Sequence, residues 1–88
     1  MALLRHEVWE EPDENEQILE ALCLAGPEGN AFRATLGDYA VLVATFEAAS
    51  HVEAMTKYYF MYDRGEYVSA HPSDYVPFAD EWRIRQKT

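Results

Sequence analysis

Three histidines, one cysteine and many carboxylates are the side chains of this chain that could do chemistry. His6, His51, His71 and Cys23, together with the acids, are of the types that bind zinc or calcium. Their spacing matches no known zinc or calcium motif, and His51 and Glu53 would point to different sides of a helix. We therefore expect no metal and no other cofactor.

A nucleophile could be formed by Cys23 with a histidine, or by Ser50 with His51. Neighbouring residues on a helix do not face each other, however, and Ser50 is suited to cap one. Cys23 lies in an apolar pattern, in which a thiol is buried and unreactive. No carboxylate pair stands out for acid–base catalysis, and the chain is short for a pocket of ~300 Å³ or more. We expect a protein that is not an enzyme.

The acidic residues are concentrated near the N-terminus of a chain whose net charge is −9. No Lys or Arg lies between His6 and Phe32, whereas the last six residues carry three basic side chains and no acid. The acids of this N-terminal segment are Glu7, Glu10, Glu11, Asp13, Glu14, Glu16, Glu20 and Glu28. Such a chain repels phosphate groups, so we expect no direct binding of nucleic acid. The acids either form a solvated face, attract a basic protein surface, or imitate a nucleic acid.

The composition indicates one domain that folds without a disulfide. Cys23 is the single cysteine, which excludes an intramolecular disulfide and suits a reducing compartment. Hydrophobic residues make up 49% of the chain, enough for one modest core. No segment approaches the ~18 apolar residues of a membrane span, and the N-terminus MALLRHEVWEE lacks a secretory leader. We expect a single compact domain over residues 1–88, located in the cytoplasm and without membrane association.

A strand and a helix are predicted at the start of the chain. Residues 3–9 partly alternate between apolar and polar, which predicts a strand with one buried face. The side chains on the buried face are Leu4, His6 and Val8. Residues 13–26 predict a helix that begins at Asp13 and ends at Gly26. An extended conformation of residues 21–25 is the alternative.

The next segment predicts a turn, a short helix and a strand. The turn at residues 26–30 lacks the lysine and the hydroxyl group of a phosphate-binding loop. Asn30 is expected to cap a helix over residues 31–36, which Gly37 ends. The nearly continuous apolar run over residues 39–46 predicts a central strand that is covered on both faces.

A second helix is predicted from its capping residues. The Ser50 hydroxyl is expected to accept from the Glu53 amide, while the Glu53 carboxylate binds the amide of Ser50. The helix should cover residues 51–63, with Gly65 in a left-handed conformation just beyond its end.

The C-terminal part predicts a strand over residues 66–69 and a short helix from Pro77 onward. A right-handed crossover through the second helix would make the strand over residues 66–69 parallel to the strand over residues 39–46. The expected fold class is α/β (or α+β), a single domain with a small two- to three-stranded sheet and packed helices.

Aromatic side chains are concentrated on the helix that Ser50 caps. At about 100° per residue, one side of this helix presents a core-facing stripe that consists of Met55, Tyr58, Tyr59 and Tyr62. Phe60 lies away from this stripe, and Met61 is also not required by it. Either a second element such as the Trp82 helix covers Phe60, or the ring is exposed and marks an interface.

The stretches CLAGPEGNAFRATL, VATFEAASHVEAMTKYYFMYDRGEY and DYVPFADEW form a recognisable pattern within residues 22–82. Its most specific parts are Phe46-Glu47-Ala48, Ser50-His51, Glu53-Ala54-Met55, Tyr58-Tyr59 and Gly65-Glu66-Tyr67. The pattern resembles a group of short uncharacterised bacterial proteins. The resemblance implies a bacterial origin and a compact α/β domain, but no activity. Members of that group often carry Gly-Trp where this chain has Asp63 and Arg64, so a role of that tryptophan does not carry over.

The expected function is that of a non-catalytic interaction protein, such as a small subunit, an inhibitor or an immunity-type partner. It would bind another protein with a basic surface through acids and aromatic residues. The candidate interface residues are Phe60, Met61, Trp82, Glu10, Glu11, Asp13 and Glu14. A homo-oligomeric structural domain is one alternative, and an acidic nucleic-acid mimic that inhibits a DNA- or RNA-binding protein is the other.

Overall fold

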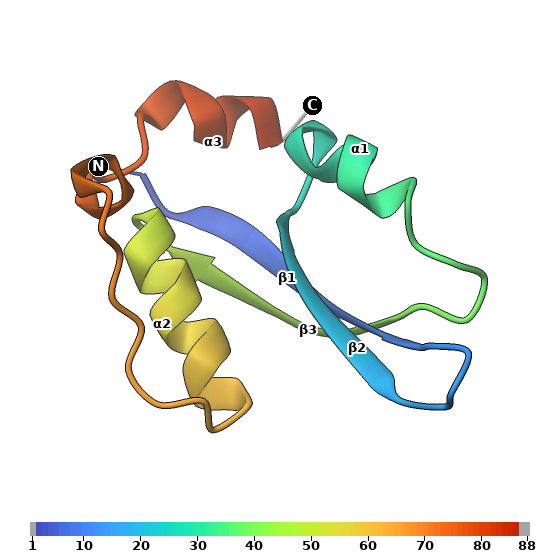
Figure 1. Cartoon of the computed structure of the whole chain (residues 1–88). Coiled ribbons are helices and arrows are strands. Elements are labelled where there is room, and N and C mark those ends of the chain that lie inside the picture. Colours follow the sequence, from blue (N-terminus) through green and yellow to red (C-terminus); the bar gives the residue numbers. More distant parts are fainter. Residues whose placement is uncertain (1, 87–88) are drawn as a thin grey trace.

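The strand β1 (Leu4–Pro12) is the centre of a three-stranded antiparallel sheet in the computed structural model, which describes residues 2–86 (Figure 1). Its neighbours are β2 (Ile18–Leu24) and β3 (Val41–Ala48), in the order β2-β1-β3. The helical elements are η1 (Pro27–Gly29), α1 (Asn30–Arg33), α2 (His51–Met61), η2 (Pro72–Tyr75) and α3 (Asp80–Gln86). The predicted mixed α/β domain with a small sheet is confirmed.

A hairpin joins β1 to β2, so the helix predicted over residues 13–26 is wrong. Asp13 caps a tight turn instead: its carboxylate accepts from the amides of Asn15 and Gln17 at 2.8 and 2.9 Å. Glu16 completes the turn with a left-handed φ of 65°. The extended alternative for residues 21–25 is confirmed as far as Leu24. A short apolar run fits a strand as well as a helix, and pairing with β1 decides between them.

The strand β3 lies at an edge of the sheet, and the prediction that it is central and covered on both faces is wrong. It pairs with β1 alone, from Leu4 opposite Ala48 to Glu10 opposite Val41, with one irregularity after Val8. Its first residues Val41, Leu42 and Val43 are exposed. The expected strand over residues 66–69 is absent from the described sheet, so the parallel crossover does not form.

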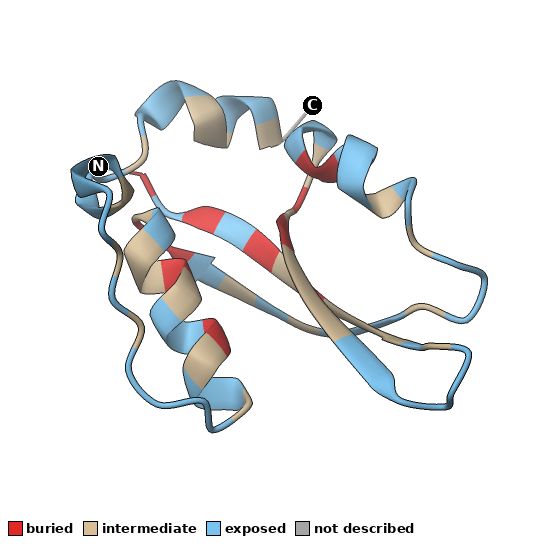
Figure 2. Ribbon diagram, in the orientation of Figure 1, coloured by how far each residue is buried: buried red, intermediate tan, exposed pale blue. Residues whose placement is uncertain are grey.

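The core is built on one side of β1. Leu4, His6 and Val8 are buried, as predicted from their alternation, and α2 lies over this side of the sheet (Figures 1 and 2). From α2, Ala54 and Tyr58 point into the same core. Small residues such as Ala48 and Ala49 complete it where the chain turns into α2. The result is a shallow core with few large side chains.

The helix α2 begins as the sequence predicts. The Ser50 hydroxyl accepts from the Glu53 amide at 3.1 Å. The Glu53 carboxylate, however, binds the amide of Ala49 at 3.2 Å, one residue before the predicted position. The helix ends at Met61, two residues early, and Gly65 adopts the expected left-handed conformation with a φ of 84°.

The short helix α1 is capped by Gly29, so the predicted cap at Asn30 is wrong. A Cβ atom on Gly29 would lie 1.9 Å from the carbonyl oxygen of Leu24, which explains the glycine. The Asn30 side chain instead accepts from Arg33, which lies at the end of the helix. The helix α1 ends at Arg33, three residues before the predicted end at residue 36.

The C-terminal segment crosses back over the start of the chain. The Phe78 carbonyl accepts from Ala2 at 3.1 Å, and the Phe78 amide donates to Ala49 at 2.7 Å. The final helix predicted from Pro77 is confirmed, although α3 begins at Asp80.

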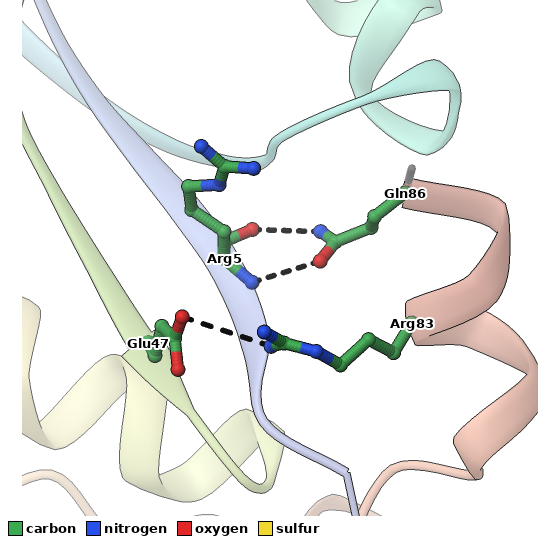
Figure 3. A pocket seen from close by; sticks show the side chains of 4 residues that line it. All are labelled: Arg5, Glu47, Arg83 and Gln86. Carbon is green, nitrogen blue, oxygen red and sulfur yellow. Dashed lines mark hydrogen bonds and ion pairs between the residues drawn. The ribbon is translucent and has the colours of Figure 1, made fainter. Parts of the chain in front are cut away.

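The side chain of Gln86 in α3 extends the sheet beyond the end of β2 (Figure 3). Its amide oxygen accepts from the Arg5 amide at 2.9 Å, and its amide nitrogen donates to the Arg5 carbonyl at 2.8 Å. A further bond of 3.0 Å joins it to the Ala25 carbonyl. Arg83 pairs with Glu47 at 3.7 Å beside it, and the enclosed space of about 30 Å³ has room for water only.

His6 is held in the core by three contacts. Its Nδ1 donates to the Leu4 carbonyl at 2.9 Å. Its ring stacks on Phe46, with centroids 5.5 Å apart and planes inclined by 12°, and Phe78 lies 5.9 Å away. Burial lowers the pKa of His6 below its ordinary value of 6.5, because the charged form is poorly solvated there.

Replacing Gln86 should loosen α3 from the sheet. Gln86→Ala is expected to lower the free energy of unfolding by about 1–2 kcal/mol, since three hydrogen bonds are lost at a partly hydrated site. Urea denaturation measures the change. Gln17→Ala, at an exposed position in the hairpin turn, is the matched control and should stay within about 0.5 kcal/mol. Equal effects of both variants would contradict a clamping role of Gln86.

Stability should fall as the pH drops below 6.5, the ordinary pKa of His6. Below pH 6.5 the unfolded chain takes up a proton at His6. The folded protein takes up this proton only when the pH reaches the lowered pKa of the buried ring. Urea denaturation at pH 7.5 and 5.5 measures this loss. His6→Phe should reduce the difference, whereas His71→Gln, at an exposed position, should leave it unchanged. The reverse pattern would show that His6 is not the group responsible.

Candidate interaction surface

Phe60 is the most exposed large apolar side chain of residues 2–86, at 87% of its maximal accessible area. Tyr58, two residues earlier on α2, is 6% exposed, so the helix separates a buried side from a solvent side at this point. Trp82 does not cover Phe60 but stacks on Phe78, with centroids 6.1 Å apart. Of the two sequence alternatives, the exposed ring is the correct one. Met61 is also exposed.

The position of Phe60 follows from its neighbour Lys57. The Lys57 ammonium group donates to the Glu47 carbonyl at 2.6 Å and lies 5.9 Å from the Phe46 ring, so it reaches over β3. Residues three apart on a helix are neighbours on its surface. Phe60 therefore lies one step further along the side of α2 from which Lys57 reaches β3.

The outer edge of β3 exposes backbone groups as well as side chains. The Ala25 amide donates to the Arg5 carbonyl, which shows that Arg5 directs its backbone groups toward β2. Because this direction alternates along an antiparallel strand, Glu7 also faces β2, and its partner Thr45 on β3 directs its backbone groups outward. Val43 and Thr45 are both exposed. An edge with open backbone groups and apolar side chains can pair with another strand.

The molecule as a whole exposes more surface than a chain of its size requires. Its accessible area is 6004 Å² at a mass of 10.1 kDa, where a folded monomer has about 5,300 Å². The radius of gyration is 13.7 Å, against about 12 Å for a compact chain of this length. The excess is consistent with a fold that leaves part of its apolar surface for a partner.

The four acids predicted at the interface do not form one continuous row. Glu10 accepts a hydrogen bond of 2.7 Å from the Tyr62 hydroxyl, and Glu11 accepts from the amide of Gly37. Asp13 shapes the hairpin turn, while Glu14 is exposed at its tip. Burial, followed by the bond to Glu10, raises the pKa of Tyr62 to about 12. Three of these four carboxylates therefore bind donors within the protein.

Arginine side chains engage most of the remaining acids near the sheet. Glu7 pairs with Arg33 at 2.9 Å. Arg85 lies 3.4 Å from Glu28. Glu20 pairs with Arg64. The negative segment found in the sequence is thus divided among several internal partners.

Arg64 is surrounded by tyrosines, which the sequence analysis did not anticipate. Its guanidinium carbon lies 5.5, 5.9 and 5.7 Å from the ring centroids of Tyr58, Tyr59 and Tyr62. The predicted tyrosine stripe is therefore partly a cation–π site that holds the end of α2 against Glu20 of β2. The left-handed Asp63, with a φ of 54°, turns the chain so that Arg64 reaches back. No local pattern signals that turn.

Cys23 is buried, as predicted, although it lies on β2 rather than on a helix. Burial raises the pKa of its thiol, and the nearby Glu7 carboxylate, 3.7 Å away, adds to the effect. A thiol that resists ionisation is a weak nucleophile. Within the described part of the chain, no three His, Cys, Asp or Glu side chains converge on a point where they could hold a metal ion.

No protein-family model, curated protein or solved structure matches this chain. The resemblance to short bacterial proteins therefore stays a prediction, and the function must be argued from the geometry. In the stretch from residue 2 to residue 86, every helix is too short or too polar to cross a lipid bilayer.

Truncating Phe60 should leave the fold intact. Phe60→Ala is expected to change the free energy of unfolding by less than about 0.5 kcal/mol, because the ring is almost fully exposed. Tyr58→Ala, two residues away on the same helix, should cost about 3–5 kcal/mol because its ring is buried. Thermal or urea unfolding of both variants measures the contrast. A large loss for Phe60→Ala would place that ring in the core.

Proposed function

We propose that this protein is a non-catalytic interaction domain that binds an extended segment of another protein along the outer edge of β3. One combination of features supports the proposal: β3 is an edge strand, and Phe60, three residues after the Lys57 that reaches the Glu47 carbonyl of β3, exposes its ring. Strand addition derives affinity from backbone hydrogen bonds and specificity from side-chain contacts. The β3 edge offers the backbone hydrogen-bonding groups, and Phe60 offers a side-chain contact.

The contacts of Lys57 limit the length of edge that a partner could use. Lys57 occupies the Glu47 carbonyl, so the accessible part of β3 extends from Val41 to about Thr45. A partner strand of similar length would cover the exposed side chain of Val43 on one face of the edge, while the register shift after Val8 brings Val41 to the face of Glu10. Phe60 would supply a further apolar contact. Phe60 and Met61 keep their place as candidate interface residues.

The charge of the protein favours a basic partner. With a net charge of −9, the whole surface attracts positive groups and accelerates their approach. Glu14 and Glu16, exposed at the hairpin turn, supply local negative charge. The proposal therefore describes a small acidic subunit or inhibitor of a basic protein. The single cysteine supports a reducing compartment such as the bacterial cytoplasm as its location.

Self-association is a second candidate, supported by the same edge. Two copies could pair their β3 strands in antiparallel fashion across a two-fold axis. The nucleic-acid mimic receives less support, because the carboxylates that it needs are bound by internal donors.

Blocking the β3 edge should abolish partner binding while the protein stays folded. In Thr45→Pro the lost amide hydrogen points away from β1, and proline is tolerated at such edge positions. We expect the tagged wild type to capture a stoichiometric protein from the native host, and Thr45→Pro and Phe60→Ala to lose it. Nuclease treatment and mass spectrometry identify the bound protein, and binding should weaken at high salt.

Ile18→Ala is the matched control, because Ile18 is an exposed apolar residue on the opposite edge strand β2. It should retain the captured protein. Light scattering at two concentrations distinguishes the second candidate: a dimer that Thr45→Pro dissociates would identify another copy of the chain as the occupant. Capture that none of these variants changes would refute the role of the β3 edge.

A further inference from the structure

A hollow of about 350 Å³ lies on the α2 side of the sheet. It is lined by residues from four segments, mainly His6, Leu22, Leu24, His51, Phe78 and Trp82. A second hollow of about 420 Å³ adjoins it and shares His51, Phe78 and Trp82. Volumes of this size are typical of small-molecule sites. The expectation that this chain is too short for such a pocket is wrong, because the C-terminal segment folds back over the sheet.

His6 places one unused polar atom at this hollow. The Leu4 carbonyl can only accept, so its bond to Nδ1 of His6 requires the proton to be on Nδ1. In the neutral ring Nε2 is then a hydrogen-bond acceptor. It has no hydrogen-bond partner among the described residues, although the His6 side chain is almost fully buried.

The open side of Nε2 is the hollow. Within residues 2–86, every completely buried side-chain nitrogen and oxygen has a hydrogen-bond partner. Nε2 of His6 has no such partner, so this atom is not completely buried. The open space beside His6 is the hollow that it lines. The bond to the Leu4 carbonyl and the stacked Phe46 ring hold the imidazole in this orientation. An acceptor fixed at the base of an apolar hollow favours a ligand with one donor.

The rest of the lining selects an uncharged and flat ligand. None of the residues that line the inner hollow is Lys, Arg, Asp or Glu, and most of the lining is apolar, which favours an uncharged ligand. Phe78 and Trp82 stack with planes inclined by 22°, and their rings border both hollows. Aromatic walls of this kind favour a ring that stacks or meets them edge-on.

We propose that this hollow binds a small uncharged aromatic molecule that carries a single hydroxyl or ring N–H group, of the phenol or indole type. The donor group binds Nε2 of His6, and the ring contacts Phe78, Trp82 and the leucines of β2. The site is separate from the β3 edge, so it goes beyond the proposed interaction with a partner protein.

Two fluorinated probes of nearly equal shape test the hydrogen bond. 4-Fluorophenol carries the donor and 4-fluorotoluene does not, and fluorine NMR gives the dissociation constant of each for the full-length protein at pH 7.5. We expect 4-fluorophenol to bind about three- to tenfold more tightly, although toluene-like molecules leave water more readily. His6→Phe keeps an aromatic ring against Phe46 but removes Nε2, and should reverse this preference.

Trp82→Ala is the complementary variant. It removes a wall of the hollow and should weaken both probes while the preference for the phenol persists. Should His6→Phe fail to fold, the nitrogen-15 shift of His6 Nε2 in the wild type provides a direct reading: 4-fluorophenol should move it and 4-fluorotoluene should not. Thr45→Pro should leave both probes unaffected, which separates this site from the β3 edge.

Three outcomes would overturn the proposal. The first is that neither probe binds the folded wild type at millimolar concentration. The second is that both probes bind equally well. The third is that the preference for the phenol survives in folded His6→Phe. Loss of the captured partner protein in the β3 variants has no bearing on these results.

Discussion

The buried side of the central strand β1 is the constraint on which the rest of this structure depends. Leu4 and Val8 are the largest side chains that the described chain buries completely, and both lie on this side. The other two strands pair with β1 on either side, and α2 covers its buried face with Ala54 and Tyr58. At the start of β1, where β2 has ended, the side-chain amide of Gln86 binds the backbone of Arg5, whose amide would otherwise stay open (Figure 3).

A core of this size leaves apolar surface in two different places. A chain of 88 residues buries a smaller share of its surface than a larger domain does. The strand β3 keeps an open edge and Phe60 is exposed on α2, while a hollow remains between the sheet and the C-terminal segment. Figure 2 shows buried residues on β1, on α2 and where β2 leads into η1, while the distant ends of β2 and β3 are exposed. Both proposed sites have this common physical origin.

The acidic residues acquire their roles from partners that lie far away in the chain. Glu7 pairs with Arg33 across 26 positions, and Glu10 binds the Tyr62 hydroxyl across 52. Arg64 combines an ion pair with three tyrosine rings, which limits its freedom more than a single surface pair would. Composition alone reports the negative charge, whereas the fold decides which carboxylates remain available to a partner.

The sequence by itself determined the features that depend on a few neighbouring residues. These are the Ser50 cap of α2, the left-handed Gly65, the alternation of β1 and the position of Phe60 away from the tyrosine stripe. The tertiary structure alone decided that residues 18–24 form a strand, that β3 lies at an edge, and that His6 faces a hollow. Apolar runs such as these satisfy a helix, a central strand or an edge strand equally well. Backbone hydrogen bonds and burial against segments distant in the chain decide which of these structures forms. A local sequence pattern contains no information about those distant contacts.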